Sequence, residues 1–214
     1  MLSLAEDLIL LALDDETGTF FRLTDINFSL ALVGALFMDL AIRGRIDIDA
    51  QNLFVVSREE TGDPLLDKTL QLISSPECSC NTTDLIRNVY NAIPGLKDSL
   101  LQSLFAKGIV EQKEEKILWL FNHRRYPVIN DTEEQEVLSR IRSSVLQERN
   151  PDSRDIVLIA LLGVCDLLEK IFTREELNTH RERIELLKSM DLISHAVNKI
   201  IAEIQMMIAS SYIA

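Results

Sequence analysis

The chain has 214 residues, of which 34 are acidic and 22 basic, and its formal net charge at neutral pH is −12. A negative field of this size repels polyanions, so sequence-independent binding of nucleic acid, DNA or RNA, is not expected. Hydrophobic residues make up 47% of the chain and charged residues 26%, which excludes a disordered protein and predicts one domain over residues 1–214.

Two helices are predicted at the start of the chain. Ser3 and Glu6 have the spacing of a capping box and precede a leucine-rich run, which predicts a helix over residues 3–13. A second helix is predicted over residues 25–44, where apolar side chains lie nearly all around the helix axis. A helix of this kind belongs at the centre of a bundle.

A short hairpin and three helices follow. Residues 45–49 alternate between apolar and polar, and residues 52–56 follow after a tight turn, which predicts a β-hairpin. Asp63 and Pro64 predict the start of the next helix, because proline fits the first helical turn. Two further helices are predicted over residues 82–91 and 94–107.

A second hairpin is predicted between residues 109 and 121, with its turn at 113–115 and its return strand at 116–121. Helical patterns then resume, and four helices are expected over about 132–148, 153–172, 173–188 and 190–210. The chain is therefore predicted to be mainly α: a single-domain helical bundle around a central buried helix, with two short β-hairpins.

The return strand of the second hairpin carries an apolar run, formed by Ile117, Leu118, Trp119, Leu120 and Phe121. Alternate residues of a strand face opposite ways, so both faces of this strand would be apolar. The second face then needs a cover, which the core, a second copy in a homo-oligomer, or a membrane interface would provide. The pattern by itself favours the core or a second copy.

No catalytic motif is evident in the sequence. The three histidines lack a neighbouring nucleophile and the i, i+4 pairing that holds zinc. Glycines occur singly, which excludes a P-loop and a dinucleotide fingerprint. Cys165 is expected to be a small buried residue. We therefore expect a protein that is not an enzyme and has no cofactor and no metal site.

The cellular location is predicted from cysteines and apolar runs. Three cysteines without a secretory leader indicate a reducing compartment, so the protein is expected to be cytoplasmic. The longest apolar run, residues 30–38, is far shorter than the ~20 residues that span a bilayer. Any membrane association is therefore expected to be peripheral.

Basic residues near the predicted ends of elements are candidate anion ligands, among them Arg22, Arg87 and Lys97. Several such residues gathered at loops would form an anion site in an otherwise acidic chain, because guanidinium binds phosphate bidentately. The alternative is that they neutralise neighbouring carboxylates and helix C-termini, and the sequence by itself favours this alternative.

Five stretches match a known family in order and spacing along nearly the whole chain. They are LAEDLILLAL at 4–13, LAIRGRI at 40–46, TGDPLLD at 61–67, KGIV at 107–110, and residues 155–172. Together they resemble the Golgi phosphoprotein 3 family. The resemblance implies a helical fold, a membrane-facing hairpin involved in self-association, and a basic pocket for phosphatidylinositol 4-phosphate. It also implies docking on Golgi membranes and binding of the cytosolic tails of membrane proteins.

The pocket of that family combines a tryptophan with three arginines. In an ungapped alignment the tryptophan position is Thr24, and the three arginine positions are Val33, Pro94 and Lys97. Only Lys97 keeps a positive charge, which should weaken phosphate recognition. The chain thus resembles a divergent member, with a bacterial source as one reading. The resemblance implies a lipid head-group site at Lys97 and Thr24, and Arg22 and Arg87, from the basic residues near element ends, are further candidates for this site.

Two functions from different classes remain open. The first is a non-enzymatic peripheral membrane protein that binds phosphoinositide or another anionic lipid near Lys97 and meets the membrane with residues 117–121. The second is a cytosolic protein-interaction module that has lost lipid binding and uses the same hairpin as a homo-oligomer interface.

Overall fold

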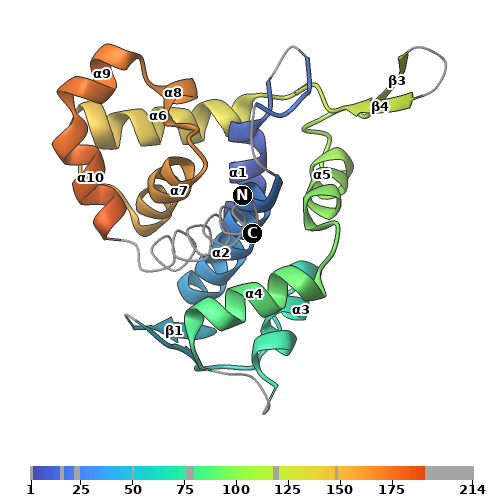
Figure 1. The fold of residues 1–214 in the computed structure, drawn as a ribbon, viewed down its shortest axis with the longest axis vertical. Coiled ribbons are helices and arrows are strands. Elements are labelled where there is room, and N and C mark those ends of the chain that lie inside the picture. The colour runs from blue at the N-terminus through green and yellow to red at the C-terminus, as the bar shows by residue number, and fades with distance from the viewer. Residues whose placement is uncertain are drawn as a thin grey trace, which may run out of the picture.

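The computed structural model is mainly helical, with two separate two-stranded antiparallel sheets in its described part (Figure 1). It describes residues 2–190 except 15–16, 22–24, 50, 76–79, 118–120 and 148, and it leaves out the side chains of 25, 114–117 and 121–124. The predicted fold class, mainly α with two short hairpins, is confirmed.

Helix α1 (Leu4–Ala12) begins at the predicted capping box. The Ser3 hydroxyl accepts a hydrogen bond from the Glu6 N–H at 3.2 Å, and the Glu6 carboxylate accepts one from the Ser3 N–H at 2.8 Å. Every residue of α1 is buried, including the charged Glu6 and Asp7. The helix is therefore an internal element whose acidic side chains need partners from other helices.

Helix α2 (Asp25–Ile42) occupies the centre of the fold, as predicted (Figure 1). Residues 30–37 are buried without exception, because α2 contacts α1, α3, α4, α5 and α7 along its length. An apolar surface on all sides can be covered only by a ring of neighbours, which explains the absence of a polar face.

The first hairpin and the next helices follow the prediction closely. Strands β1 (Ile46–Ile48) and β2 (Leu53–Val55) pair antiparallel. Helix α3 (Pro64–Ile73) is capped by the Asp63 side chain, and α4 (Thr82–Ala92) by the Asn81 side chain. Helix α5 (Leu96–Ala106) begins two residues later than predicted, after a turn at Pro94 and Gly95.

The register predicted for the second hairpin is wrong. Strand β3 (Lys113–Ile117) pairs with β4 (Phe121–Arg125), so residues 113–115 belong to a strand and are not the turn. The polar run suggested a turn, but a ladder of five residue pairs forms when the strands extend to residue 125. Ile117 is thus the last residue of β3 and Phe121 the first of β4, and residues 118–120 lie outside the described part.

Two of the predicted C-terminal helices are each divided in two. Helix α6 (Thr132–Leu146) is followed by α7 (Ser153–Val164) and α8 (Leu168–Ile171). Asp166, in the left-handed conformation with φ 57°, lies between α7 and α8. The Leu167 N–H donates to the Leu162 carbonyl there, as in a Schellman motif. His180 separates α9 (Arg174–Thr179) from α10 (Arg181–Ser189). The helix predicted over 190–210 lies outside the described residues, apart from residue 190.

Candidate functional site

A cavity of about 420 Å³ lies where the central helix meets the junction between α4 and α5. Helix α2 supplies one wall, the end of α4 supplies another, and the turn with the first residues of α5 completes the lining. The lining residues are Ser29, Val33, Tyr90, Asn91, Ile93, Pro94, Gly95, Leu96, Lys97 and Asp98.

The N-terminus of α5 opens onto this cavity. The residue at its N-cap is Gly95, with φ 74°, and no side chain caps the helix. The first residues of a helix carry backbone N–H groups without an intrahelical acceptor, and the helix dipole makes this end partly positive. Leu96, Lys97 and Asp98 are these residues, and all three line the cavity. The arrangement is chemically suited to an anion.

Lys97 is held over an aromatic ring. Its ammonium nitrogen lies 4.9 Å from the centroid of the Phe20 ring, and Phe20 in turn packs on Phe28 of α2 at a centroid distance of 5.6 Å. A cation above an aromatic face is attracted by the ring quadrupole. This contact fixes the stem of Lys97 beside the cavity and links the residues that precede α2 to the start of α5.

One negative charge opposes the lysine. Asp98 follows Lys97 in the first turn of α5, is exposed, and lines the same cavity. A carboxylate in the first turn of a helix is favourable for the helix itself. It also cancels part of the positive potential, so the formal charge of the lining side chains is zero. Recognition of an anion here has to rely on Lys97 and the backbone N–H groups.

The structure brings together some of the residues that the sequence singled out. Val33, Pro94 and Lys97, three positions matched to the pocket of the family, line one cavity although they come from two distant segments. Thr24 and Arg22 lie outside the described residues. Arg87 is on α4, 3.8 Å from the Asp84 carboxylate, and is not among the lining residues.

Other contributors to the site were missed by sequence reasoning. Tyr90 and Asn91 line the cavity from the last turn of α4, and Phe20 positions Lys97. The Pro94-Gly95 turn was the available signal, because it separates two helical patterns and thereby exposes the end of one helix and the start of the next. Nothing in the sequence indicated the contact between Phe20 and Lys97.

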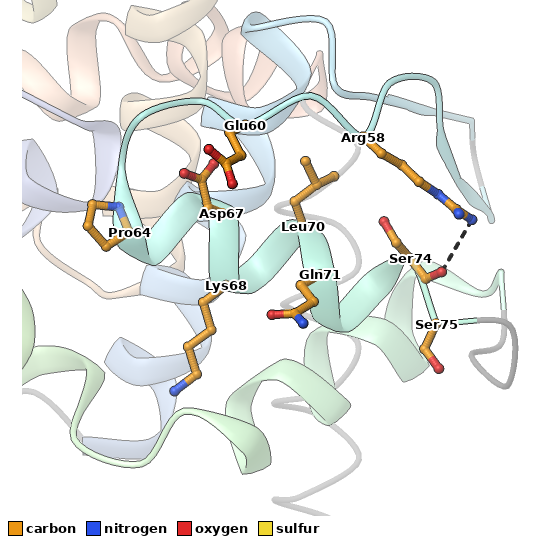
Figure 2. A pocket seen from close by; sticks show the side chains of 9 residues that line it. All are labelled: Arg58, Glu60, Pro64, Asp67, Lys68, Leu70, Gln71, Ser74 and Ser75. Carbon is orange, nitrogen blue, oxygen red and sulfur yellow. Dashed lines mark hydrogen bonds between the residues drawn. The ribbon is translucent and has the colours of Figure 1, made fainter.

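Figure 2 shows a second, larger cavity of about 610 Å³ along the outer side of α3. Arg58 and Lys68 line it together with Glu60 and Asp67, so its charges also cancel. Asp67 accepts hydrogen bonds from the N–H and the hydroxyl of Thr61, at 2.6 and 2.7 Å, which lower the pKa of its carboxyl. The Asp67 carboxylate therefore holds the loop that leads into α3.

The second hairpin projects from the helical body (Figure 1). Near its base, Val110 bridges Val128, and the Ile129 N–H donates to the Ile109 carbonyl at 2.9 Å. Two large apolar side chains close to this base are exposed, Phe105 by 47% and Ile129 by 60%. The base of the hairpin thus presents two exposed apolar side chains.

Two findings concern only the described part of the chain. None of its helices combines the length and the apolar character needed to cross a membrane. Within the same residues, no group of three or more His, Cys, Asp or Glu side chains is arranged to hold a metal ion.

The fold and site define a helical protein with a buried central helix, a projecting hairpin and a cavity at a helix N-terminus. Residues 4–204 match the family model of Golgi phosphoprotein 3 (GPP34), and the chain belongs to that family. Vacuolar protein sorting-associated protein 74 of Eremothecium gossypii is 30% identical over 207 aligned positions. That alignment covers 80% of this chain and 62% of the relative, so the chain spans less than two thirds of that protein.

Proposed function

We propose that this chain is a cytoplasmic, non-enzymatic peripheral membrane protein that binds a phosphorylated anionic lipid of the phosphatidylinositol 4-phosphate type. The head group would occupy the cavity between α2, α4 and α5. The observation that carries the proposal is the position of Lys97, which lines that cavity in the uncapped first turn of α5. Membership of the Golgi phosphoprotein 3 family supports it.

The chemistry of this site suits a phosphate monoester better than a simple carboxylate or a neutral head group. A phosphate can accept hydrogen bonds from the Lys97 ammonium and from backbone N–H groups of the first turn at the same time. A charge-assisted hydrogen bond of this kind contributes about 1.5–3 kcal/mol. Because the cavity offers one cationic side chain against Asp98, we expect weak binding that depends on display of the lipid in a membrane.

The second hairpin would contact the same membrane. In the sequence, the apolar run at 117–121 connects the paired strands β3 and β4, which project from the body, and tryptophan is favoured at membrane–water interfaces. A weak head-group site and a small apolar contact reinforce one another when both reach one surface. Cytosolic tails of membrane proteins are further partners that the family membership suggests.

Vesicle flotation tests the proposal. Vesicles of phosphatidylcholine alone, with phosphatidylserine, and with phosphatidylinositol 4-phosphate would be compared, the last two at equal surface charge. We expect flotation to be strongest with phosphatidylinositol 4-phosphate and to be lost in Lys97→Glu. Lys68→Glu is the matched control, because Lys68 is an exposed lysine that lines the other cavity. Trp119→Ala should reduce flotation without changing the preference for lipid.

Three outcomes would reject the proposal or move the proposed site. Equal flotation with both anionic vesicles would show that charge alone is read and would reject the head-group site. A loss in Lys68→Glu with full binding in Lys97→Glu would move the site to the cavity along α3. The absence of flotation with every vesicle at low salt would reject the membrane function.

A second candidate function is self-association through the same hairpin. The exposed side chains of Phe105 and Ile129 favour it, because exposed apolar groups gathered at one place often mark interfaces. The mass in solution of the wild type and of Trp119→Asp would test it. An oligomer that dissociates in the variant supports this function, and a wild-type monomer at high concentration rejects it.

A further inference from the structure

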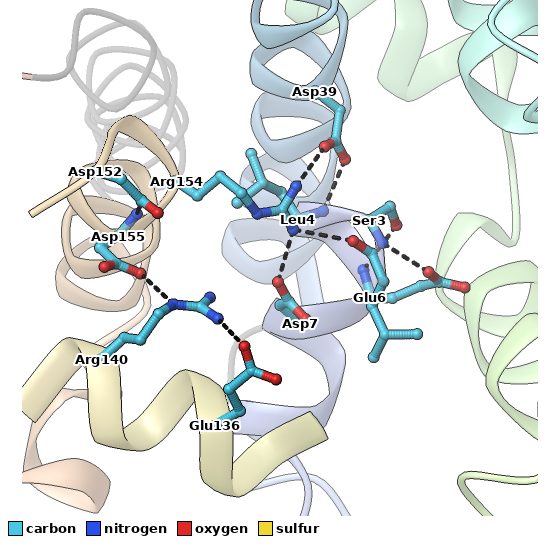
Figure 3. A network of polar contacts seen from close by, with 11 residues as sticks. Ser3, Leu4, Glu6, Asp7, Asp39, Glu136, Arg140, Asp152, Arg154 and Asp155 are labelled. Carbon is cyan, nitrogen blue, oxygen red and sulfur yellow. Dashed lines mark hydrogen bonds and ion pairs between the residues drawn. The ribbon is translucent and has the colours of Figure 1, made fainter. Parts of the chain in front are cut away.

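Arg154 lies between two buried carboxylates from different helices (Figure 3). Its Nη2 is 2.8 Å from Oδ2 of Asp7 on α1, and its Nη1 is 3.4 Å from Oδ1 of Asp39 on α2. The same Nη2 donates to the Leu2 carbonyl at 3.0 Å, and the Leu4 N–H donates to Asp39 at 2.7 Å. The cluster therefore fastens the start of α1 to α2 and to the first turn of α7.

The charges in this cluster do not balance. Asp7 and Asp39 are 4% and 1% exposed, and one guanidinium serves both of them. When both carboxylates are ionised, one negative charge is buried without its own counter-ion, which is costly in a low-dielectric interior. Asp39 also lies in the last turn of α2, where the helix dipole disfavours negative charge.

The neighbouring groups do not correct the imbalance. On α6, Arg140 is already bound to Asp155 of α7 at 3.1 Å and to Glu136 at 3.1 Å. Asp152, in turn, caps α7 through the Asp155 N–H. Four other charged groups face the cluster or its partners at longer range; they are Arg43, which acts on Asp39, Glu6 with its partner Lys107, and Glu133.

Solvent can reach one side of the cluster. A cavity of about 380 Å³ is lined by Leu2, Asp7, Glu133, Glu136, Val137, Arg140, Asp152 and Arg154. Asp7 is thus buried from bulk water but borders a space through which a proton can enter. Asp39 is not among the lining residues, but it shares the Arg154 guanidinium with Asp7, so the two carboxylates would titrate as a coupled pair.

We propose that the Asp7–Arg154–Asp39 cluster is a proton-binding switch that tightens the attachment of α1 to α2 and α7 in weakly acidic solution. One proton on the pair removes the excess charge and leaves one carboxylate for one guanidinium. The remaining contacts of Arg154 with Leu2 and of Asp39 with the Leu4 N–H are kept. Nothing in this proposal depends on lipid binding at the α5 cavity.

Burial of the two carboxyl groups changes their pKa values in the direction that the geometry requires. Burial raises the pKa of Asp7 to about 6, although the hydrogen bond and charge of Arg154 act to lower it. Burial likewise raises the pKa of Asp39 to about 6, opposed by the Leu4 N–H and by Arg154. In the unfolded chain both groups titrate near 3.8. The native protein therefore binds more protons at these two groups between these values, and their contribution to its stability increases as pH falls through about 6.

Two measurements on the full chain test the switch. Carboxyl-detected NMR titration of the wild type should show an aspartate signal with a midpoint near pH 6. From about pH 7.5 to about pH 5, the folding equilibrium constant should rise roughly tenfold per proton bound. Hydrogen exchange corrected for its intrinsic pH dependence should show this gain at the α1 amides of Leu8 to Leu11.

Asp7→Asn mimics the protonated state, because its amide oxygen can still accept from Arg154. In this variant the pH dependence of α1 protection should be largely lost. Asp131→Asn, at an exposed carboxylate that makes no side-chain cap bond, is the matched control and should behave as the wild type. Asp39→Asn replaces Asp7→Asn if the latter does not fold. The proposal is overturned if neither Asp7 nor Asp39 titrates well above the ordinary ~3.9 of an aspartate, or if Asp7→Asn keeps the wild-type pH dependence.

Discussion

The carbonyl oxygen of Gly18 accepts a hydrogen bond of 2.8 Å from the backbone N–H of Tyr126. This contact joins the segment after α1 to the residue that follows β4. Gly18 has φ 64°, and a Cβ placed on it would lie 2.2 Å from the nitrogen of Pro127. The base of the projecting hairpin is therefore fixed to the body through a close backbone approach that only glycine permits.

Gly18→Ala is predicted to destabilise the fold by about 3 kcal/mol or more, because backbone must move in addition to the left-handed strain. Gly108→Ala is the control: its φ is 69°, but an added Cβ meets nothing within 4 Å. That variant should lose only about 1–2 kcal/mol, the cost of the left-handed conformation. Urea unfolding measures both, and equal losses would contradict the close approach.

Glu6→Ala is predicted to destabilise the fold by about 2–3 kcal/mol, because a cap and buried hydrogen bonds are lost together. The Glu6 carboxylate accepts from the Ser3 N–H, the Ser103 hydroxyl and the Lys107 ammonium. Glu6→Gln keeps an acceptor and should lose less. Chemical unfolding of the three proteins at neutral pH compares them, and an equal loss in both variants would contradict a role for the acceptor.

The contribution of Glu6 should also depend on pH in a defined direction. Burial raises the pKa of Glu6, but the hydrogen bonds from Lys107, Ser103 and Ser3 outweigh burial and leave it below 4.5. Its stabilising effect is therefore complete above pH 4.5 and is lost as pH falls through the native pKa. The difference between wild type and Glu6→Ala should shrink in acid.

Asp98→Asn is predicted to strengthen binding of phosphatidylinositol 4-phosphate vesicles severalfold. The change removes the one negative side chain among the cavity-lining residues and leaves Lys97 and the backbone N–H groups of α5 in place. Titration of vesicles at fixed salt measures the effect. Asp84→Asn, also an exposed carboxylate in the first turn of a helix, should not change binding. Weaker vesicle binding by Asp98→Asn than by the wild type would show that the anion does not occupy this cavity.

Cys165 is predicted to resist thiol reagents in the native protein. Burial, with a smaller effect of Asp166, raises the pKa of its thiol to about 12, and the residue is 5% exposed. Cys80 is exposed and should react quickly. Counting labelled thiols in Cys78→Ser, before and after unfolding, separates the two. Rapid labelling of both cysteines without denaturant would contradict the burial of Cys165.

The N-terminal half of the fold was predictable because the capping residues at the starts of its helices are close in sequence to the residues they bind. Ser3, Asp63 and Asn81 each cap a helix in the structure through contacts within three residues, and such contacts are legible in a sequence. Asp166 shows the limit. It ends α7 in a conformation that glycine usually adopts, so nothing in the sequence marked the break.

The hairpin and the site depended on longer-range information. The pairing of β3 with β4 is a choice between registers that the polar run at 113–115 did not reveal. Lys97 was identified because its position matches the pocket of the family, and the structure adds its neighbours. The contact between Lys97 and Phe20 joins segments that are distant in sequence. Neither the lysine nor the phenylalanine indicates in the sequence which residue it will contact.

The burial of α2 on all sides also constrains the order in which the protein can mature. Among its main neighbours in the part of the chain that the structure describes, α7 comes latest in the sequence; it begins at residue 153 and leaves the ribosome long after α2 itself. Until α7 has been synthesised, one apolar face of α2 is exposed to water, and a nascent chain with such an exposed apolar face is a substrate for chaperones. Truncation before residue 153 should accordingly yield an aggregating fragment instead of a smaller folded protein.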